Sequence, residues 1–249
     1  MKRIIGIFFI IAAIVMFMRD GSKTVEAQLI AAEAAEMKQA QTQVVTTATT
    51  AQESAVTVPE WYADTENCVG WITIGGTKVD YPIMWEGEKE DPADPFYLHH
   101  SFDGTKTSNG AIFMRGVNHK EMNDNIVLIY GHHMKSGAMF AGLESFKYDS
   151  FFREDREVKL STITGERQLK PVAVVVVPDA EPMKTAMTAG EIESFLNDKT
   201  YTGANGKIYN RYIYQNDGVD LSKRMYFFIT CSYEEAPQSM REIVIMQAK

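Results

Sequence analysis

The chain has 249 residues and is 45% hydrophobic, which is enough for one domain of ordinary size and an additional segment. Its 25 Lys and Arg against 33 Asp and Glu give a formal net charge of −8. This balance, without any basic cluster that could neutralise phosphates, argues against a nucleic-acid-binding protein. Two cysteines, Cys68 and Cys231, are too few for a disulfide scaffold. A bridge between them would consume a candidate nucleophile, so we expect both thiols to be free.

The first 23 residues have the pattern of a membrane anchor. Lys2 and Arg3 precede fifteen residues without a polar side chain, 4–18. A helix of this length spans about 22 Å, less than the ~30 Å hydrocarbon layer, so its charged flanks must reach the interface. A signal peptide cleaved near Val25-Glu26-Ala27 is the alternative, but that site lies well beyond the apolar run. The basic flank predicts a single-pass anchor in the cell membrane, with the rest of the chain extracytoplasmic.

Residues 24–58 are expected to form a stalk and a linker without chemistry of their own. Ala, Glu and Gln dominate 24–41, which favours a polar helix. Residues 42–57 are rich in Thr and Ala and lack periodicity, as is typical of a linker. The folded domain is therefore expected over 59–249.

The pattern of residues 59–249 predicts a mainly β domain. Two apolar triplets, Ile72-Thr73-Ile74 and Val79-Asp80-Tyr81, flank Gly75-Gly76, which predicts a hairpin with a two-residue turn. Many short strands with few helices favour a closed or nearly closed β-barrel with peripheral helices. Further strands are expected at 111–114, 126–130, 158–163 and 168–177, and helices at 138–146 and 188–197, the second opened by a Thr188–Glu191 capping box.

Three reactive side chains lie at predicted strand ends. Cys231 ends the apolar run 226–231, Arg241 opens the next run, and His132 follows the strand 126–130 after one glycine. Strand ends present side chains from a rigid sheet to a cleft. A thiol, whose reference pKa is about 8.5, is a weak nucleophile until a histidine or a cation helps to ionise it. We therefore predict that these three residues meet at one rim of the barrel.

Other candidate sites carry weaker signals. Cys68 has no such neighbours in its motif and is interpreted as structural. His133 is either a hydrogen-bonding neighbour of the site or a surface residue, and we favour the surface residue. The acidic stretch 86–91 is typical of a solvated loop rather than a calcium site. By residue type, zinc could be bound by His99, His100, His132 and Cys231. These residues lack the spacing of metal ligands, so no metal is expected.

The motifs of the domain resemble those of the sortases, specifically class B. The resemblance extends from about residue 60 to the end of the chain. It rests on six segments in this order: Val69-Gly70-Trp71, Val79-Asp80-Tyr81-Pro82-Ile83, Gly110-Ala111-Ile112-Phe113-Met114, Tyr130-Gly131-His132-His133-Met134 with Met139-Phe140, Thr230-Cys231, and Arg241.

The resemblance implies a sortase-type β-barrel and a cysteine transpeptidase of a Gram-positive bacterium that needs no cofactor. Such enzymes cleave a C-terminal sorting motif, similar to Asn-Pro-x-Thr-Gly, after its threonine, and transfer the secreted protein through a thioester to a cell-wall amine such as a peptidoglycan precursor. By motif position, Cys231 would be the nucleophile, His132 the acid/base and Arg241 the stabiliser of the oxyanion or of the substrate backbone. The implied substrate-pocket residues are Leu98, Tyr130 and Ile229.

Two departures from the family pattern concern the cysteine strand. The family often shows Thr-Leu-x-Thr-Cys, whereas 227–231 lacks the first threonine, for which we expect only a packing difference. Some class B members carry an acidic residue directly after the cysteine, where this chain has Ser232. We assign no acidic residue to orient the histidine, and we expect the resting enzyme to be mostly thiol and neutral imidazole. A pilin-polymerising sortase with a lysine acceptor and a catalytically silent sortase-fold binding module remain alternatives.

Overall fold

The computed structural model describes residues 67–88, 94–232 and 239–249. The predicted anchor, stalk and linker, 1–58, and the expected beginning of the domain at residue 59 lie outside the described residues. Among the residues that the structure does describe, no helix combines the length and the apolar character needed to cross a membrane.

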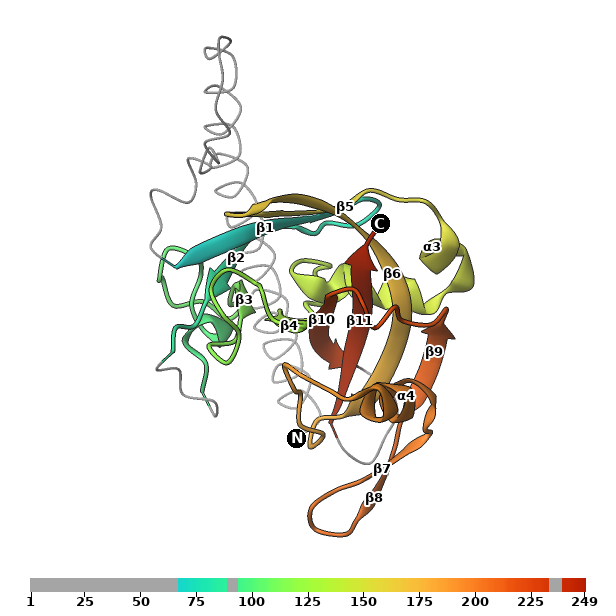
Figure 1. The fold of residues 1–249 in the computed structure, drawn as a ribbon. Helices are drawn as coiled ribbons and strands as arrows, with labels where there is room; N and C mark the ends of the chain where they lie inside the picture. The colour runs from blue at the N-terminus through green and yellow to red at the C-terminus, as the bar shows by residue number, and fades with distance from the viewer. Residues whose placement is uncertain (1–66, 89–93, 233–238) are drawn as a thin grey trace, which may run out of the picture.

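Eight strands close into a barrel (Figure 1). Neighbours follow the order β11-β10-β4-β3-β2-β1-β5-β6, and the pairing of β11 with β6 completes the ring. Closure leaves no open sheet edge in the ring, and it confirms the predicted mainly β barrel. The barrel strands are β1 (Cys68–Ile74), β2 (Asp80–Trp85), β3 (Ile112–Met114), β4 (Ile126–Tyr130), β5 (Val158–Thr162), β6 (Gly165–Pro178), β10 (Met225–Ser232) and β11 (Met240–Ala248).

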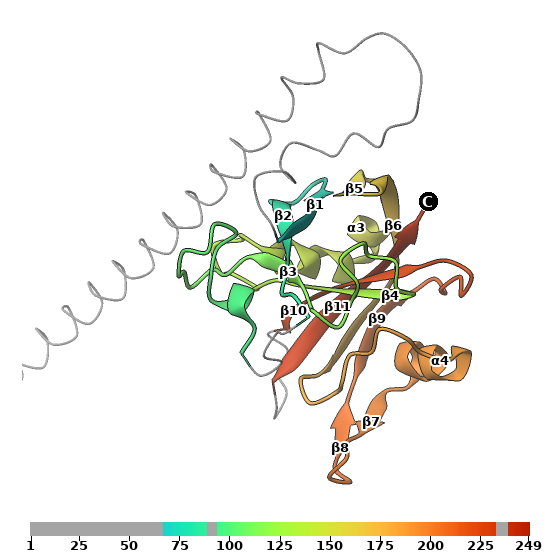
Figure 2. The same cartoon turned by 60° about the vertical axis from the view of Figure 1, so that its left-hand side comes forward.

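Helical segments and three further strands decorate the barrel. The predicted helices form as η2 (Phe140–Lys147), which is a 3-10 helix, and α4 (Ala189–Asn197), whose capping box joins Thr188 and Glu191. The sequence did not predict η1 (Phe96–Leu98), α3 (Asp149–Arg153) or β9 (Tyr212–Asn216), which extends the sheet from β6. It also missed the hairpin of β7 (Thr200–Thr202) and β8 (Ile208–Asn210), which projects beyond the barrel in both views (Figures 1 and 2).

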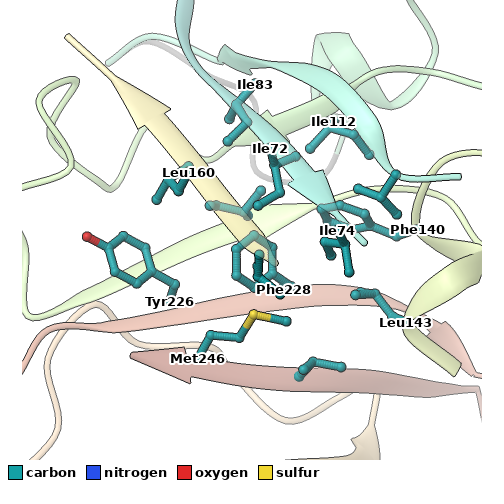
Figure 3. Close-up of a cluster of buried hydrophobic side chains, with 14 of the residues drawn as sticks. Ile72, Ile74, Ile83, Ile112, Phe140, Leu143, Leu160, Tyr226, Phe228 and Met246 are labelled. Atoms are coloured by element: carbon teal, nitrogen blue, oxygen red, sulfur yellow. The ribbon is translucent and has the colours of Figure 1, made fainter. Parts of the chain in front are cut away.

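Side-chain alternation divides the apolar residues into two clusters. Tyr226 and Phe228 of β10 point into the barrel, where Phe140 and Leu143 of η2 pack against the interior cluster (Figure 3). Phe227 and the other odd-numbered residues of β10 lie on the outer face, which α4 covers. Successive residues of a strand face opposite sides, so a residue's number along β10 tells whether it faces the barrel interior or this outer face.

The first hairpin is confirmed, but its predicted two-residue turn is wrong. Thr73 pairs with Asp80, and four residues, 75–78, connect β1 and β2 after the Ile74–Val79 hydrogen bond. Of the two glycines only Gly76 has a positive φ, 79°. The longer turn forms because Oγ1 of Thr77 donates to the Ile74 carbonyl at 2.8 Å and accepts from the Val79 amide at 3.0 Å.

Candidate active site

Cys231 and Arg241 are direct cross-strand partners on β10 and β11. The Cα atoms of such a pair lie about 4.5–5.5 Å apart, and their side chains leave the same face of the sheet. Cys231 shares its face with Ile229, and Arg241 shares its face with Ile243, both of which belong to the outer apolar cluster. The thiol is exposed where this cluster ends. Strand register therefore places the sulfur and the guanidinium side by side.

His132 joins this pair from the other side of β10. β4 runs parallel to β10 with Tyr130 opposite Ile229, and the Gly131 amide extends this ladder with a 3.1 Å hydrogen bond to the Ile229 carbonyl. His132 therefore continues β4 alongside Cys231, one strand spacing of about 5 Å away. Its Nε2 donates a 2.8 Å hydrogen bond to the Leu98 carbonyl. A neutral ring in this arrangement keeps its basic lone pair on Nδ1.

Gly131 is the reason that the chain can bring His132 to this position. A Cβ at residue 131 would lie 2.4 Å from Cδ1 of Ile112 and 2.8 Å from Cδ2 of Phe140. Carbon atoms make favourable contact at about 3.5–4.0 Å, so any side chain here would displace the core or the strand end. The three residues predicted from the sequence are thus brought to one rim of the barrel, as expected, and their chemical roles stay predictions.

Asp179 extends the row formed by His132, Cys231 and Arg241, and it was not predicted from the sequence. It follows β6, which pairs with β11 on the side opposite to β10. Its Oδ1 forms an ion pair with Nε of Arg241. The family pattern points to an acidic residue only at the positions just after Cys231, far from residue 179 in the sequence. The signal that could have found Asp179 is its place directly after β6, because the other three residues also lie at or near the end of a strand.

The interpretation of His133 as a surface residue is wrong. Its side chain is only 8% exposed, its Nδ1 donates to the Cys231 carbonyl at 3.1 Å, and its Nε2 lies 3.4 Å from Oε2 of Glu144. A β-bridge between His133 and Met139 holds the backbone in this position. His133 therefore binds the backbone of the candidate nucleophile, whereas His132 lies beside its side chain.

The two cysteines differ in their surroundings, and neither forms a disulfide, as predicted. Burial raises the pKa of the Cys68 thiol to about 12, in keeping with its interpretation as structural. The pKa of Cys231 is also raised, first by partial burial and second by the negative charge of Asp179, while Arg241 acts in the opposite direction. This direction agrees with the expectation that the resting Cys231 is mostly an un-ionised thiol.

An ion pair lies under the row on the opposite face of the sheet. Glu242, adjacent to Arg241 in β11, is fully buried, and its Oε2 lies 3.2 Å from Nζ of Lys147 in η2. The same ammonium approaches Oγ of Ser232 at 3.4 Å. The pair fastens the ends of β10 and β11 to η2, and so it supports the rim that carries Cys231 and Arg241.

The three predicted pocket residues lie around the row in different environments. Leu98 is half-buried and provides the carbonyl that His132 binds. Tyr130 is half-buried, with its ring 5.7 Å from that of Phe113. Ile229 is only 1% exposed within the outer cluster, so contact with a substrate would require its neighbours to move. Their role in substrate binding stays a prediction.

No group of three or more His, Cys, Asp and Glu side chains suited to a metal ion occurs within the described parts of the chain. His132 binds the Leu98 carbonyl, and Cys231 lies beside Arg241 across the pair of strands β10 and β11.

Comparison with known proteins shows which proteins this chain resembles. No family model matches the sequence. The chain is 40% identical to sortase B of Listeria monocytogenes over 81 residues, which is 32% of this chain and 31% of that protein. It is 26% identical to sortase B of Staphylococcus aureus over 183 residues, 72% of this chain and 69% of that protein.

Solved structures show the same fold. Sortase B of Bacillus anthracis in complex with AAEK1 matches with a TM-score of 0.64 and 21% identity, over 92% of this chain and 99% of that chain. Sortase B of Clostridium perfringens matches with a TM-score of 0.57 and 25% identity, over 76% and 97%. A substrate complex of Staphylococcus aureus sortase B matches with a TM-score of 0.59 and 21% identity, over 76% and 82%.

The chain is similar to the class B sortases in sequence and in fold. Class B sortases are cysteine transpeptidases, so the exposed thiol of Cys231 beside His132 and Arg241 is the part of this chain on which its chemistry is expected to depend.

Proposed function

We propose that this sortase cleaves the C-terminal sorting motif of secreted proteins after a threonine and transfers the threonine carbonyl to an amine of the cell wall. The observation that carries the proposal is the row of His132, Cys231 and Arg241 on three adjacent strands of a class B sortase barrel. The Staphylococcus aureus relative has been solved as a substrate complex, which supports a sorting-signal peptide as the substrate here. A motif similar to Asn-Pro-x-Thr-Gly follows from the family resemblance.

The first half-reaction forms an acyl-enzyme. The Cys231 thiol transfers its proton to His132, and the thiolate attacks the threonine carbonyl carbon. The carbonyl oxygen becomes an oxyanion, to which the guanidinium of Arg241 donates hydrogen bonds while it keeps its own charge. As the tetrahedral intermediate collapses, the C–N bond breaks, and the His132 imidazolium protonates the leaving glycine amine. A thioester between Cys231 and the threonine remains.

The second half-reaction reverses these roles. An incoming amine attacks the thioester carbonyl and loses a proton to His132. The C–S bond breaks, and the Cys231 sulfur leaves as a thiolate, which regains its proton from the imidazolium. The products are a new amide and the resting enzyme, so no cofactor or metal enters the balance.

We also propose that the apolar run 4–18 anchors the enzyme in the cell membrane, with the catalytic domain on the extracytoplasmic side. The charge pattern around this run supports the orientation. In this arrangement the enzyme would meet its substrates as they leave the cell, close to the amine acceptor on peptidoglycan precursors.

The full-length chain in detergent, incubated with peptides of the form Asn/Ser/Leu-Pro-x-Thr-Gly, tests the proposal. We expect cleavage between Thr and Gly, and transfer to an added amine nucleophile, read by mass spectrometry. Cys231→Ala should abolish both, whereas Cys68→Ala, at a buried thiol remote from the row, should leave both nearly intact. Equal losses in the two variants, or no cleavage of any peptide by the wild type, would refute the assignment.

A further inference from the structure

The sheet itself fixes the position of Asp179. Arg241 pairs with Val177 across β11 and β6, and the Asp179 amide extends the ladder with a 2.9 Å hydrogen bond to the Ser239 carbonyl. Asp179 therefore lies two residues beyond the cross-strand partner of Arg241, on the same face, within reach as a diagonal neighbour. Strands β10, β11 and β6 lie side by side (Figure 1), so Cys231, Arg241 and Asp179 follow one another across the sheet.

The contact uses a specific edge of the guanidinium. Oδ1 of Asp179 pairs with Nε of Arg241, which leaves the hydrogens on the two terminal nitrogens directed elsewhere. Those terminal nitrogens form the planar donor fork that recognises oxygens in pairs. The two side chains are 49% and 32% exposed, and an ion pair this accessible to water adds little to the stability of a fold. Its position next to the nucleophile makes a role in the reaction the stronger interpretation.

We propose that Asp179 is a positioning residue for the sortase reaction. It holds Arg241 by its Nε edge so that the terminal nitrogens face the substrate oxyanion, and its negative charge disfavours the thiolate of Cys231 in the resting enzyme. The first role rests on the proposed function, because it needs the oxyanion of an acyl transfer. The second concerns the thiol alone and can be measured without a substrate.

The charges around Cys231 determine the sign of the second effect. Arg241 favours the thiolate and Asp179 disfavours it, in agreement with the raised pKa of the thiol. His132 and His133 face Cys231 from beyond β4, and Lys147 with Glu242 lies on the opposite face of the sheet. Glu234 and Glu235 follow in the sequence, outside the described residues. If the charge of Asp179 is removed, the influence of Arg241 is no longer opposed, so the thiol pKa falls.

Two substitutions separate the charge from the hydrogen bond. Asp179→Asn removes the charge but keeps an oxygen that can accept from Nε of Arg241, whereas Asp179→Ala removes both. The matched control is Asp217→Asn, which breaks the exposed ion pair with Arg153. Asp217 binds the Val172 carbonyl, five residues along β6 from Val177, and hence lies about 17 Å from the row. All three variants are expected to fold, which thermal unfolding checks.

The substrate-free test is the rate of iodoacetamide alkylation of the full-length chain between pH 6 and 10, with Cys231 identified by peptide mass spectrometry. Both Asp179 variants should shift the rate profile to lower pH and raise the rate at pH 7 about two- to fivefold, as a charge about 10 Å away implies. Asp217→Asn should match the wild type. Wild-type profiles in both Asp179 variants, or shifts to higher pH, would overturn the inference. So would an equal shift in the double variant Glu234→Gln/Glu235→Gln, because the effect would then not be specific to Asp179.

The activity test uses cleavage of a sorting-motif peptide. Asp179→Ala should lower kcat about tenfold with little change in KM, because Arg241 loses its orientation, whereas Asp179→Asn should lose less than about threefold. A combination of faster alkylation and slower turnover in Asp179→Ala is not expected from a merely structural residue. Equal kcat losses in the two variants would overturn the positioning role. If the wild type cleaves no peptide, the proposed function fails, and alkylation still decides the coupling between Asp179 and Cys231.

Discussion

Gly131 offers a test of how the core positions His132, the proposed acid/base. In Gly131→Ala the new methyl group would lie 2.4 Å from Cδ1 of Ile112 and 2.8 Å from Cδ2 of Phe140. These contacts are shorter than normal by about 1 Å, which exceeds what a rotamer adjustment in a filled core absorbs. Overpacking of this kind costs about 1–3 kcal/mol. If the free energy of unfolding falls by about 2 kcal/mol, the middle of this range, the Tm of a domain of this size should fall by about 4–8 °C.

The measurement is thermal unfolding by circular dichroism, together with kcat/KM for a sorting-motif peptide. Because residue 131 directly precedes His132, we expect activity to fall more than stability alone explains, by about tenfold or more. Gly190→Ala is the matched control: a methyl group at this position of α4 would have no atom within 4 Å, so alanine should raise helix stability slightly.

A second variant tests the cause of the loss. Ile112→Val removes the Cδ1 atom that the new methyl group would meet at 2.4 Å. Alone it should destabilise the domain by about 0.5–1.5 kcal/mol, but in the Gly131→Ala background it should cost less or restore stability. An unchanged Tm and full activity in Gly131→Ala, or strict additivity of the two substitutions, would refute the steric argument.

Two further predictions concern the charges on the two faces of the rim. Lys147→Met leaves the buried carboxylate of Glu242 without its ammonium partner, so the free energy of unfolding measured by urea titration should fall by about 3–5 kcal/mol. The double variant Lys147→Met/Glu242→Leu should recover most of that loss. Equal stability of the single variant and the wild type would contradict this prediction. Arg241→Lys keeps the positive charge but loses the planar donor fork and the Nε contact to Asp179. In a peptide-cleavage assay kcat should therefore fall about a hundredfold or more. Near-normal turnover would remove Arg241 from its proposed role.

The strands that line the core were predictable because their apolar runs are long and β-branched. The pattern predicted β4 at its observed bounds, and it predicted β6 and the β10–β11 pair within a few residues. β7, β8 and β9 escaped prediction because their side chains are mostly exposed or half-buried, so no apolar alternation marks them.

The sequence predicted those residues of the candidate site that lie near the end of a recognisable strand. Cys231, Arg241 and His132 each stand at such a position, and the sheet brings them together. The pairing of β6 with β11 could not be deduced from residue order, because these strands are more than sixty positions apart. Asp179 depends on that pairing and was therefore missed. His133 was misjudged for a similar reason, since its partner, the Cys231 carbonyl, is 98 residues away.

The covalent state of Cys231 during turnover is the sharpest test of the proposed reaction. The full-length chain is mixed with a sorting-motif peptide whose released glycine fragment cannot attack the thioester again. The reaction is quenched in acid, and the protein is analysed by intact and peptide mass spectrometry. We predict an adduct that consists of the peptide up to its threonine, joined as a hydroxylamine-sensitive thioester to Cys231. No adduct, or an adduct on Cys68, would contradict the proposed reaction.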